Sequence, residues 1–317
     1  MPTTAPMRAA AIDIGTNSVL LLVAERDANG VLSVLEERAT VTRLGEGVDR
    51  TRELRKEAIE RTIGCLRTYA ERVRALGVTE LAMVGTSAMR DATNGPAFRE
   101  DIAFLFGVPV RTLSGAEEAE LTFRGALSGL TVPREDATVF DIGGGSTEVV
   151  TDRAADGESY AHSFDIGSVR LHERHLRTDP PTLPEIDALR ADAKSILAPL
   201  ADAKNARSAH VVGVAGTVTT LAAVHGSIAP YDGAKVHGYE LNRGEVERVA
   251  KRLAGMPLSE RQVVPGLDPK RADVIVAGAY VTLAVMDALA AERIIVSDRG
   301  VRWGLIETLL PPARPAT

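Results

Sequence analysis

Glycine, serine and acidic residues are concentrated in the stretch Asp141–Glu148, which reads Asp-Ile-Gly-Gly-Gly-Ser-Thr-Glu. Apolar runs flank it on both sides, so the pattern predicts a tight turn between two strands. The three glycines, Gly143–Gly145, tolerate positive φ, which lets neighbouring backbone N–H groups converge on phosphate oxygens. Asp141 and Glu148 stand at the strand ends, where their carboxylates can share a hard cation such as Mg²⁺. An ordinary glycine-rich hairpin with surface acids is the alternative for this stretch taken alone.

A second stretch, Ala9–Val23, repeats the order of apolar strand, Asp-Ile-Gly, small polar turn and apolar strand. Asp141 follows Asp13 by 141 − 13 = 128 residues, a spacing too long for a solenoid repeat and suited to two related domains. Two such turns facing each other across a cleft would hold a phosphate-bearing ligand from both sides. The repetition therefore favours a phosphate site over an ordinary hairpin.

Two single residues have types and positions that suit the chemistry of an oxyanion. Arg90 follows a short apolar run, and ligands of open α/β sheets gather at the carboxyl ends of strands. Ser114–Glu117 has the spacing of a capping box, which gives Glu117 a structural role. Glu118, about 100° further round the same helix, has no such role and is a candidate to face the cleft. A solvated surface acid is the alternative for Glu118 considered by itself.

Two further glycine-containing turns are candidate phosphate contacts. Gly167 and Ser168 follow an expected strand and offer a glycine and a hydroxyl group. Gly216 and Thr217 lie between an apolar strand and a helix, and the N-terminus of a helix attracts anions. Tight packing explains glycines in such a turn equally well.

The composition of the 317-residue chain is that of an average globular protein, with 45% hydrophobic and 25% charged residues. A net charge of −6 argues against general nucleic-acid binding, which relies on a basic surface. Cys65 is the single cysteine, which excludes an intrachain disulfide and suggests a buried structural thiol. The N-terminal residues lack the apolar core of a signal peptide, and the most apolar run, 274–284, is too short for a bilayer span. We therefore expect a cytoplasmic protein without a membrane partner.

The alternation of apolar strands with helical patterns predicts an α/β fold. The length favours two domains, for which we expect residues 1–126 and 127–317, with the option that the final helix, 301–312, packs back on the first domain. The expected strands include 30–36, 108–113, 160–164 and 293–296. The expected helices include 51–76, 185–200 and 271–291.

The sequence resembles the Ppx/GppA family of exopolyphosphatases and guanosine-pentaphosphate phosphohydrolases. The matching motifs span nearly the whole chain, in family order. They are DIGTNS (Asp13–Ser18), TSAMRDATN (Thr86–Asn94), SGAEEAEL (Ser114–Leu121), DIGGGSTE (Asp141–Glu148), VAGT (Val214–Thr217) and VSDRGVRWGL (Val296–Leu305). The resemblance implies the actin-like, ribonuclease H-like fold, in which two related domains each carry a mixed β-sheet flanked by helices around an interdomain cleft.

The resemblance also implies roles for individual residues. Glu118 matches the family's catalytic base, and Asp141 and Glu148 match acids implicated in binding a divalent metal, which we expect to be Mg²⁺; Asp13 joins them as a candidate ligand. The remaining candidates for binding substrate phosphates are Thr16, Asn17, Ser18, Arg90, Gly143, Gly144, Gly145, Ser146, Ser168, Gly216 and Thr217. Trp303 departs from the pattern, because many members carry an acid there. The chain also lacks the additional helical module of longer relatives, so we expect activity on short rather than long polyphosphate.

The leading hypothesis is an exopolyphosphatase that releases terminal phosphate from inorganic polyphosphate by metal-assisted attack of water, with hydrolysis of the 5′ γ-phosphate of pppGpp as its close alternative. An ATP-dependent kinase of the same superfamily and a non-catalytic sensor of phosphate ligands are hypotheses of different classes. The family resemblance suggests a homodimer.

Overall fold

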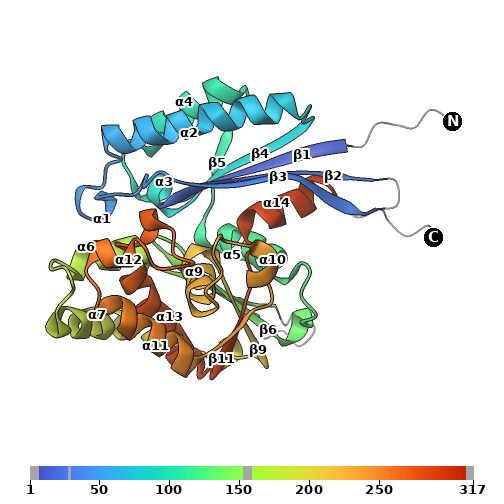
Figure 1. The fold of residues 1–317 in the computed structure, drawn as a ribbon. Coiled ribbons are helices and arrows are strands. Elements are labelled where there is room, and N and C mark those ends of the chain that lie inside the picture. The colour runs from blue at the N-terminus through green and yellow to red at the C-terminus, as the bar shows by residue number, and fades with distance from the viewer. Residues whose placement is uncertain (1–6, 28–29, 153–158, 312–317) are drawn as a thin grey trace. The chain divides into compact units, whose positions relative to one another are not determined.

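The computed structural model describes residues 7–27, 30–152 and 159–311. It divides into two compact units, of which unit 1 comprises residues 1–114 and 301–317 and unit 2 comprises residues 115–300 (Figure 1). Residues 1–6, on which the expectation of no signal peptide largely rests, and residue 312, the expected end of the last helix, lie outside the described residues. None of the described helices combines the length and apolarity needed to span a bilayer.

Unit 1 is built on a five-stranded mixed sheet with the order β3-β2-β1-β4-β5. The strand β1 pairs antiparallel with β2 and parallel with β4, and β5 continues the parallel half of the sheet. The strand bounds are β1 Met7–Ile14, β2 Ser18–Arg26, β3 Leu32–Val41, β4 Glu80–Gly85 and β5 Val110–Thr112. Ala9 to Ile12 and Ile14 are fully buried, as expected for a central strand that is covered on both faces.

Helices cover the two faces of the unit 1 sheet (Figure 1). On one face α2 packs with α4, and its Leu66 and Tyr69 join Ile12 and Leu21 in one hydrophobic core. On the other face α14, near the C-terminus, packs against β1 and β2. The helix bounds are α1 Val48–Thr51, α2 Lys56–Ala75, α3 Ser87–Asp91, α4 Gly95–Phe106 and α14 Val301–Leu309.

Unit 2 has a six-stranded mixed sheet with the order β10-β11-β9-β6-β7-β8. The strand β6 pairs antiparallel with β7 and parallel with β9, β8 extends the antiparallel half, and β11 extends the parallel half. The strand bounds are β6 Ala137–Ile142, β7 Thr147–Thr151, β8 Tyr160–Phe164, β9 His210–Val214, β10 Glu240–Asn242 and β11 Arg293–Val296. The antiparallel strand β10 closes the edge beside β11.

The two faces of this sheet carry different helices. The amphipathic helix α5 packs Ala119 and Phe123 against Val139 and Val150 on one face, and Phe140 faces the larger core on the other, which includes residues of α7, α9, α11 and α13. The helix bounds are α5 Gly115–Leu127, α6 Ser168–His175, α7 Leu183–Ile196, α8 Ala198–Asp202, α9 Ala215–His225, α10 Gly233–Val236, α11 Arg243–Ala254, α12 Leu258–Arg261 and α13 Ile275–Leu289.

The two sheets repeat one topology in the register that the sequence predicts. Asp13 pairs with Leu20 across β1 and β2, and Asp141 pairs with Glu148 across β6 and β7, so both members of the pair shift by the same 128 residues. In each unit a third antiparallel strand follows, and the next strand returns parallel to the first. The predicted α/β class with two helix-flanked mixed sheets is thus confirmed.

Several element boundaries differ from the predictions. The helix predicted for 185–200 is two helices, α7 and α8, because Pro199 in the first turn of α8 lacks the N–H needed to continue α7. The helix predicted from residue 271 begins at Ile275, and the third strand runs over Leu32–Val41 rather than 30–36. The strands predicted for 160–164 and 293–296 are confirmed as β8 and β11.

The compact units divide at residues 114 and 115, before the domain boundary expected at 126, because α5 packs on β6, β7 and β8. The expected boundary stays a prediction as a statement about domains. Within unit 1, Arg302 Nε of α14 donates to Glu37 Oε1 of β3 at 3.1 Å, and Arg26 Nε donates to the Leu310 carbonyl at 2.8 Å. These contacts attach the last helix to the first sheet.

We expect Phe140→Ala to lower the free energy of unfolding of unit 2 by about 3–5 kcal/mol, because the ring is fully buried beneath Gly213. Phe104→Ala is the matched control, since that ring on α4 is 94% exposed, and its effect should stay within about 0.5 kcal/mol. Urea unfolding followed by circular dichroism measures both. Equal effects of the two substitutions would contradict the assignment of the core.

Candidate functional site

The glycine-rich turn of unit 2 connects β6 to β7. It is closed by the Gly143 N–H, which donates to the Ser146 carbonyl at 3.0 Å. The turn also contacts the start of α6. Ser168 N–H donates to Gly143 O, and the N–H groups of Val169 and Arg170 both donate to Gly144 O, at distances of 2.9–3.0 Å. The third glycine carbonyl, Gly145 O, accepts a hydrogen bond from Arg170 Nε at 2.6 Å.

These contacts fix the direction of the peptide groups in the turn. In a planar trans peptide the N–H points opposite to the C=O. Because the carbonyls of Gly143, Gly144 and Gly145 are bound by the α6 side, the N–H groups of Gly144, Gly145 and Ser146 point away from α6. Consecutive N–H groups directed to one side form an anion-binding concavity, so the predicted phosphate turn has the required geometry.

Gly167 allows α6 to approach this closely. A Cβ at residue 167 would lie 2.4 Å from Gly144 O and 2.7 Å from Gly145 N, both backbone atoms that cannot move aside cheaply. Ser168 is buried, and its hydroxyl lies 3.3 Å from Gly143 O. The predicted contact residues Gly143–Ser146 and Ser168 therefore come together at one place.

The turn of unit 1 has the same closure, in which Gly15 N–H donates to Ser18 O at 3.0 Å. Its carbonyls are also held from one side, since Gly45 N–H donates to Thr16 O and the N–H groups that follow β3 donate to Asn17 O. Asn17 is 8% exposed, and its Oδ1 has no hydrogen-bond partner among the described residues. Such a buried polar atom is a candidate ligand contact.

The predicted acids Asp141 and Glu148 face each other across β6 and β7 on the same side of the sheet. Their exposed fractions are 9% and 1%. Thr122 Oγ1 of α5 donates to Asp141 Oδ2 at 3.4 Å, and Ser163 Oγ of β8 donates to Glu148 Oε1 at 2.6 Å. Both of these donors are neutral hydroxyl groups.

Glu118 lies in the first turn of α5 and is 7% exposed. It precedes Thr122 by one helical turn, so both side chains are on the face that meets Asp141. Gly115, one turn earlier, is so close to Ser163 that a Cβ there would lie 2.4 Å from the serine Cβ. The structure thus brings Glu118 to the same side of the unit 2 sheet as Asp141 and Glu148, and it is a buried acid rather than a solvated one.

The metal ligands were predicted as Asp13, Asp141 and Glu148. Asp13 belongs to unit 1 and is 8% exposed, whereas the other two belong to unit 2. Across the described ranges 7–27, 30–152 and 159–311, no group of three or more His, Cys, Asp or Glu side chains is arranged to hold a metal ion. The shared metal site therefore stays a prediction.

Two predicted substrate residues of unit 1 make structural contacts. Thr16 Oγ1 accepts from Ala88 N–H at 3.2 Å and shares a hydrogen bond with Ser87 Oγ at 2.7 Å, which ties the turn to α3. Arg90 Nη1 donates to the Leu113 carbonyl at 2.9 Å. Their expected roles in binding phosphate stay predictions.

The start of α9 contacts the end of β6, next to the glycine turn of unit 2. Thr217 is 5% exposed and its Oγ1 donates to Ile142 O at 3.3 Å. Over Gly216 lies the guanidinium of Arg271, so close that a Cβ at 216 would be 1.6 Å from Arg271 Nη1. Arg271 carries no sequence signal of this position, because a basic residue among other charged residues does not indicate which helix N-terminus it reaches through the fold.

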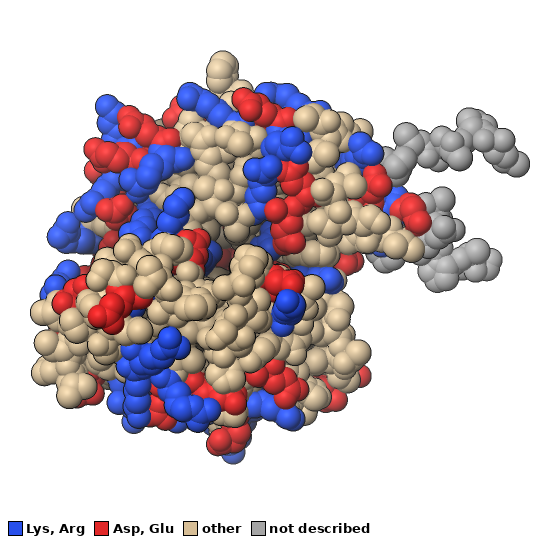
Figure 2. All heavy atoms as spheres, in the orientation of Figure 1, with Lys and Arg blue, Asp and Glu red and all other residues tan. Residues whose placement is uncertain are grey.

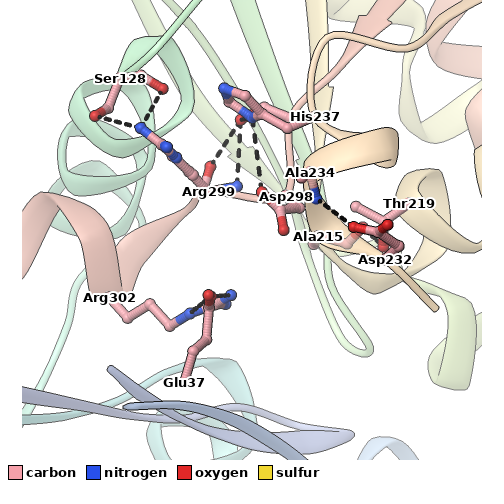
Figure 3. Close-up of polar contacts among 11 residues, drawn as sticks. Glu37, Ser128, Ala215, Thr219, Asp232, Ala234, His237, Asp298, Arg299 and Arg302 are labelled. Atoms are coloured by element: carbon pink, nitrogen blue, oxygen red, sulfur yellow. Dashed lines mark hydrogen bonds and ion pairs between the residues drawn. The ribbon is translucent and has the colours of Figure 1, made fainter. Parts of the chain in front are cut away.

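Asp298 and Arg299, which follow β11, make contacts within unit 2 (Figure 3). Arg299 Nη1 donates to the carbonyl and hydroxyl of Ser128 at 2.9 and 3.0 Å. Asp298 Oδ1 lies 3.6 Å from His237 Nδ1, and burial, together with the Arg299 charge, lowers the pKa of His237. Trp303, the departure noted in the sequence, is 6% exposed on α14 of unit 1, where it acts as a packing residue.

Cys65 lies on α2, half-buried, and burial raises the pKa of its thiol. A raised pKa disfavours the nucleophilic thiolate, in agreement with a structural role. Over the visible face of each unit, acidic and basic side chains are interspersed (Figure 2).

The model of the Ppx/GppA phosphatase family matches residues 22–313. The chain is 41% identical to exopolyphosphatase 2 of Mycobacterium tuberculosis (strain CDC 1551 / Oshkosh) over 95% of this chain and 98% of that protein. Two of the solved structures that are similar to it illustrate the match. The Aquifex aeolicus Ppx/GppA family member has a TM-score of 0.79, 32% identity, and coverage of 96% of this chain and 98% of that one.

An exopolyphosphatase from Cytophaga hutchinsonii is the second solved structure. It has a TM-score of 0.87, 27% identity, and coverage of 96% of this chain and 98% of that one. These similarities cover nearly the whole chain. They confirm the resemblance read from the motifs, and the chain belongs to the Ppx/GppA phosphatase family, with its actin-like two-domain fold.

Proposed function

We propose that this protein is an exopolyphosphatase, a phosphoanhydride hydrolase that releases terminal phosphate from short inorganic polyphosphate. One observation carries the proposal: in unit 2 a turn whose N–H groups Gly144–Ser146 point to one side adjoins three buried acids, Glu118, Asp141 and Glu148. An oriented anion turn next to carboxylates supplies both the phosphate site and the groups needed to activate water. The relative from M. tuberculosis that bears the name exopolyphosphatase 2 supports this assignment.

The turn contributes charge stabilisation. Negative charge on the transferring phosphoryl group must be neutralised during attack. The N–H groups of the turn are already held in position by their carbonyl contacts, so they need no reorganisation when a phosphate binds. We infer that Gly143–Ser146, Ser168, Gly216 and Thr217 of unit 2 bind substrate phosphates, and that Arg271 above Gly216 adds a positive charge.

Asp141 and Glu148 fit a divalent cation such as Mg²⁺. They are buried neighbours on adjacent strands, and two such carboxylates repel each other unless a cation or a proton intervenes. Mg²⁺ is often held by one or two carboxylates together with substrate phosphates and water, so two acids suffice. When bound, the ion supplies Lewis-acid polarisation of a phosphoryl oxygen. Asp13 is proposed as a further ligand.

Glu118 is proposed as the catalytic base. It orients a water molecule and accepts its proton as the water oxygen bonds to the terminal phosphorus. The bridging P–O bond breaks, and the shortened polyphosphate leaves with the bridging oxygen, while the terminal group departs as orthophosphate. A general base must be held within hydrogen-bond reach of the water that it activates. The burial of Glu118 in the first turn of α5 restricts its side chain more than exposure to solvent would, so it suits this role.

The unit 1 residues Thr16, Asn17, Ser18 and Arg90 are proposed to contact further phosphates of the chain. Asn17 has the strongest case, because its buried side-chain oxygen has no hydrogen-bond partner among the described residues. We also propose a cytoplasmic homodimer that needs neither nucleic acid nor a membrane.

Phosphohydrolysis of pppGpp is the alternative within the same family, since it cleaves the same type of bond. To test the assignment, phosphate release is measured from short polyphosphate, long polyphosphate, pppGpp and ATP, with Mg²⁺ and with a chelator. We expect fastest release from short polyphosphate and loss of activity on chelation, restored by excess Mg²⁺. Preference for pppGpp would select the alternative. Transfer of phosphate from ATP to a small acceptor would indicate a kinase, and binding without release would indicate a sensor.

We expect Glu118→Gln to reduce kcat on polyphosphate by about a hundredfold or more, the usual size of a general-base effect, without lowering thermal stability. Glu120→Gln is the matched control on the same helix, because the Glu120 side chain is 44% exposed and pairs with Arg124. It should retain full activity. Wild-type turnover by the Glu118 variant would remove Glu118 from the mechanism.

We expect Gly167→Ala to weaken phosphate release, because the added Cβ would press on Gly144 O at 2.4 Å and displace the turn. The matched control is Gly64→Ala in α2, where a Cβ meets nothing within 4 Å and should stabilise the helix by about 0.5–1 kcal/mol. Steady-state kinetics and thermal melts separate the effects. Unchanged KM and kcat in Gly167→Ala would show that the close approach of α6 is dispensable.

A further inference from the structure

Arg170 lies in the first turn of α6 and is 7% exposed. Arginine is almost never buried without compensation. Asp165 Oδ1 lies 4.0 Å from Nη2, and the Asp165 side chain is 83% exposed, so that ion pair is solvent-screened and weak. The Nε–H of Arg170 donates to the Gly145 carbonyl at 2.6 Å, within the turn that presents N–H groups.

The turn of unit 1 shows what this contact replaces. By the 128-residue repeat, Asn17 corresponds to Gly145. The carbonyl of Asn17 accepts from the backbone N–H groups of Thr42 and Arg43 at 3.0 and 2.9 Å. In unit 2 the backbone N–H groups at the start of α6 reach Gly143 O and Gly144 O, and a side chain reaches Gly145 O. The carbonyl of Gly145 in unit 2 is therefore held by a side chain, whereas the corresponding carbonyl of Asn17 in unit 1 is held by backbone N–H groups.

This difference matters because residue 145 is glycine. Reversal of the peptide between Gly145 and Ser146 rotates ψ of Gly145 and φ of Ser146. Because glycine has no Cβ to restrict its backbone rotation, the Gly145 side offers little resistance to this reversal once its carbonyl is released. A reversed peptide would direct an oxygen, rather than the N–H of Ser146, toward a bound phosphate. Attraction for the anion would then become repulsion.

We propose that Arg170 is a positioning residue for phosphate binding: its Nε–H, by holding the Gly145 carbonyl, keeps the Ser146 N–H directed at the terminal phosphates of the substrate. The proposal rests on the proposed function and adds a residue that acts through the turn without touching substrate. It also assigns the hydrogen bond at the Nε position, rather than the positive charge, as the operative feature.

Three substitutions separate the hydrogen bond from the charge. In Arg170→Gln the amide nitrogen stands the same number of bonds from Cα as Arg Nε, so a donor remains and the charge is lost. In Arg170→Lys the charge remains, but a carbon occupies that position. Arg170→Met removes both. Arg174→Met is the matched control, because Arg174 lies one turn later on α6 and pairs with Asp192.

The affinity for tripolyphosphate is measured by titration calorimetry in a Glu118→Gln background, and KM and kcat are measured in the active enzyme. Loss of a hydrogen bond to a charged donor predicts about 10- to 100-fold weaker binding for Arg170→Met. Arg170→Lys should resemble Arg170→Met, Arg170→Gln should recover most of the affinity, and Arg174→Met should match the parent. The expected kinetic signature is a raised KM. Thermal melts identify variants that fail to fold. If Arg170→Met fails to fold, the comparison of Arg170→Gln with Arg170→Lys still decides the question.

Parent-like affinity in all three Arg170 variants, or recovery by Lys but not by Gln, would overturn the positioning role while leaving the proposed function intact. Failure of the wild-type protein both to bind tripolyphosphate and to release phosphate would overturn the proposed function, and the role of Arg170 with it.

Discussion

The structure depends on the orientation of a few peptide groups in two turns. In each turn the carbonyl oxygens accept hydrogen bonds from the segment that follows the third strand, residues 42–45 in unit 1 and 168–170 in unit 2. A peptide whose oxygen is held on one side must present its N–H on the other. The N–H groups proposed to bind anions thus belong to the main chain, and the sheets serve to bring the third strand of each unit back to its turn.

The unit 2 acids are understandable in the same terms. Buried carboxylates are costly unless a cation, a proton or several donors compensate them. Asp141 and Glu148 each accept a hydrogen bond from a hydroxyl group, and they are neighbours on adjacent strands. Buried neighbouring acids are common where a cation and a charged substrate meet. The proposed site chemistry would therefore also account for the burial of these side chains.

Much of this could be read from the sequence because the relevant signals are local. The motif around Asp13 and its copy around Asp141 each lie between apolar runs, and that pattern specifies strand, turn and strand. The residues of each turn then follow from the pairing register of the two strands that flank it. Glu118 was identified because its neighbour Glu117 matched the capping pattern, which left the next acid without a structural duty.

The rest depends on contacts between distant parts of the chain, which no local pattern encodes. Arg170 and Arg271 gain their positions only when α6 and the loop before α13 reach the turns and helix ends they touch. The amphipathic helix α5 has an apolar face that suits any sheet, so the sequence did not tell which sheet it covers. The sequence predicts Thr16 as a phosphate contact, which stays a prediction; its hydroxyl hydrogen-bonds with α3, a partner that a local pattern of small polar residues does not specify.

The path of the chain through the two units has a consequence for biosynthesis. Unit 2 is contained in one continuous segment, 115–300, whereas unit 1 is completed by α14, which packs on β1 and β2. As the polypeptide emerges from the ribosome, the second unit can acquire its full complement of contacts while one face of the first sheet still awaits its covering helix. The apolar surface of β1 and β2 that α14 covers is then open to chaperones and to aggregation until that helix is released.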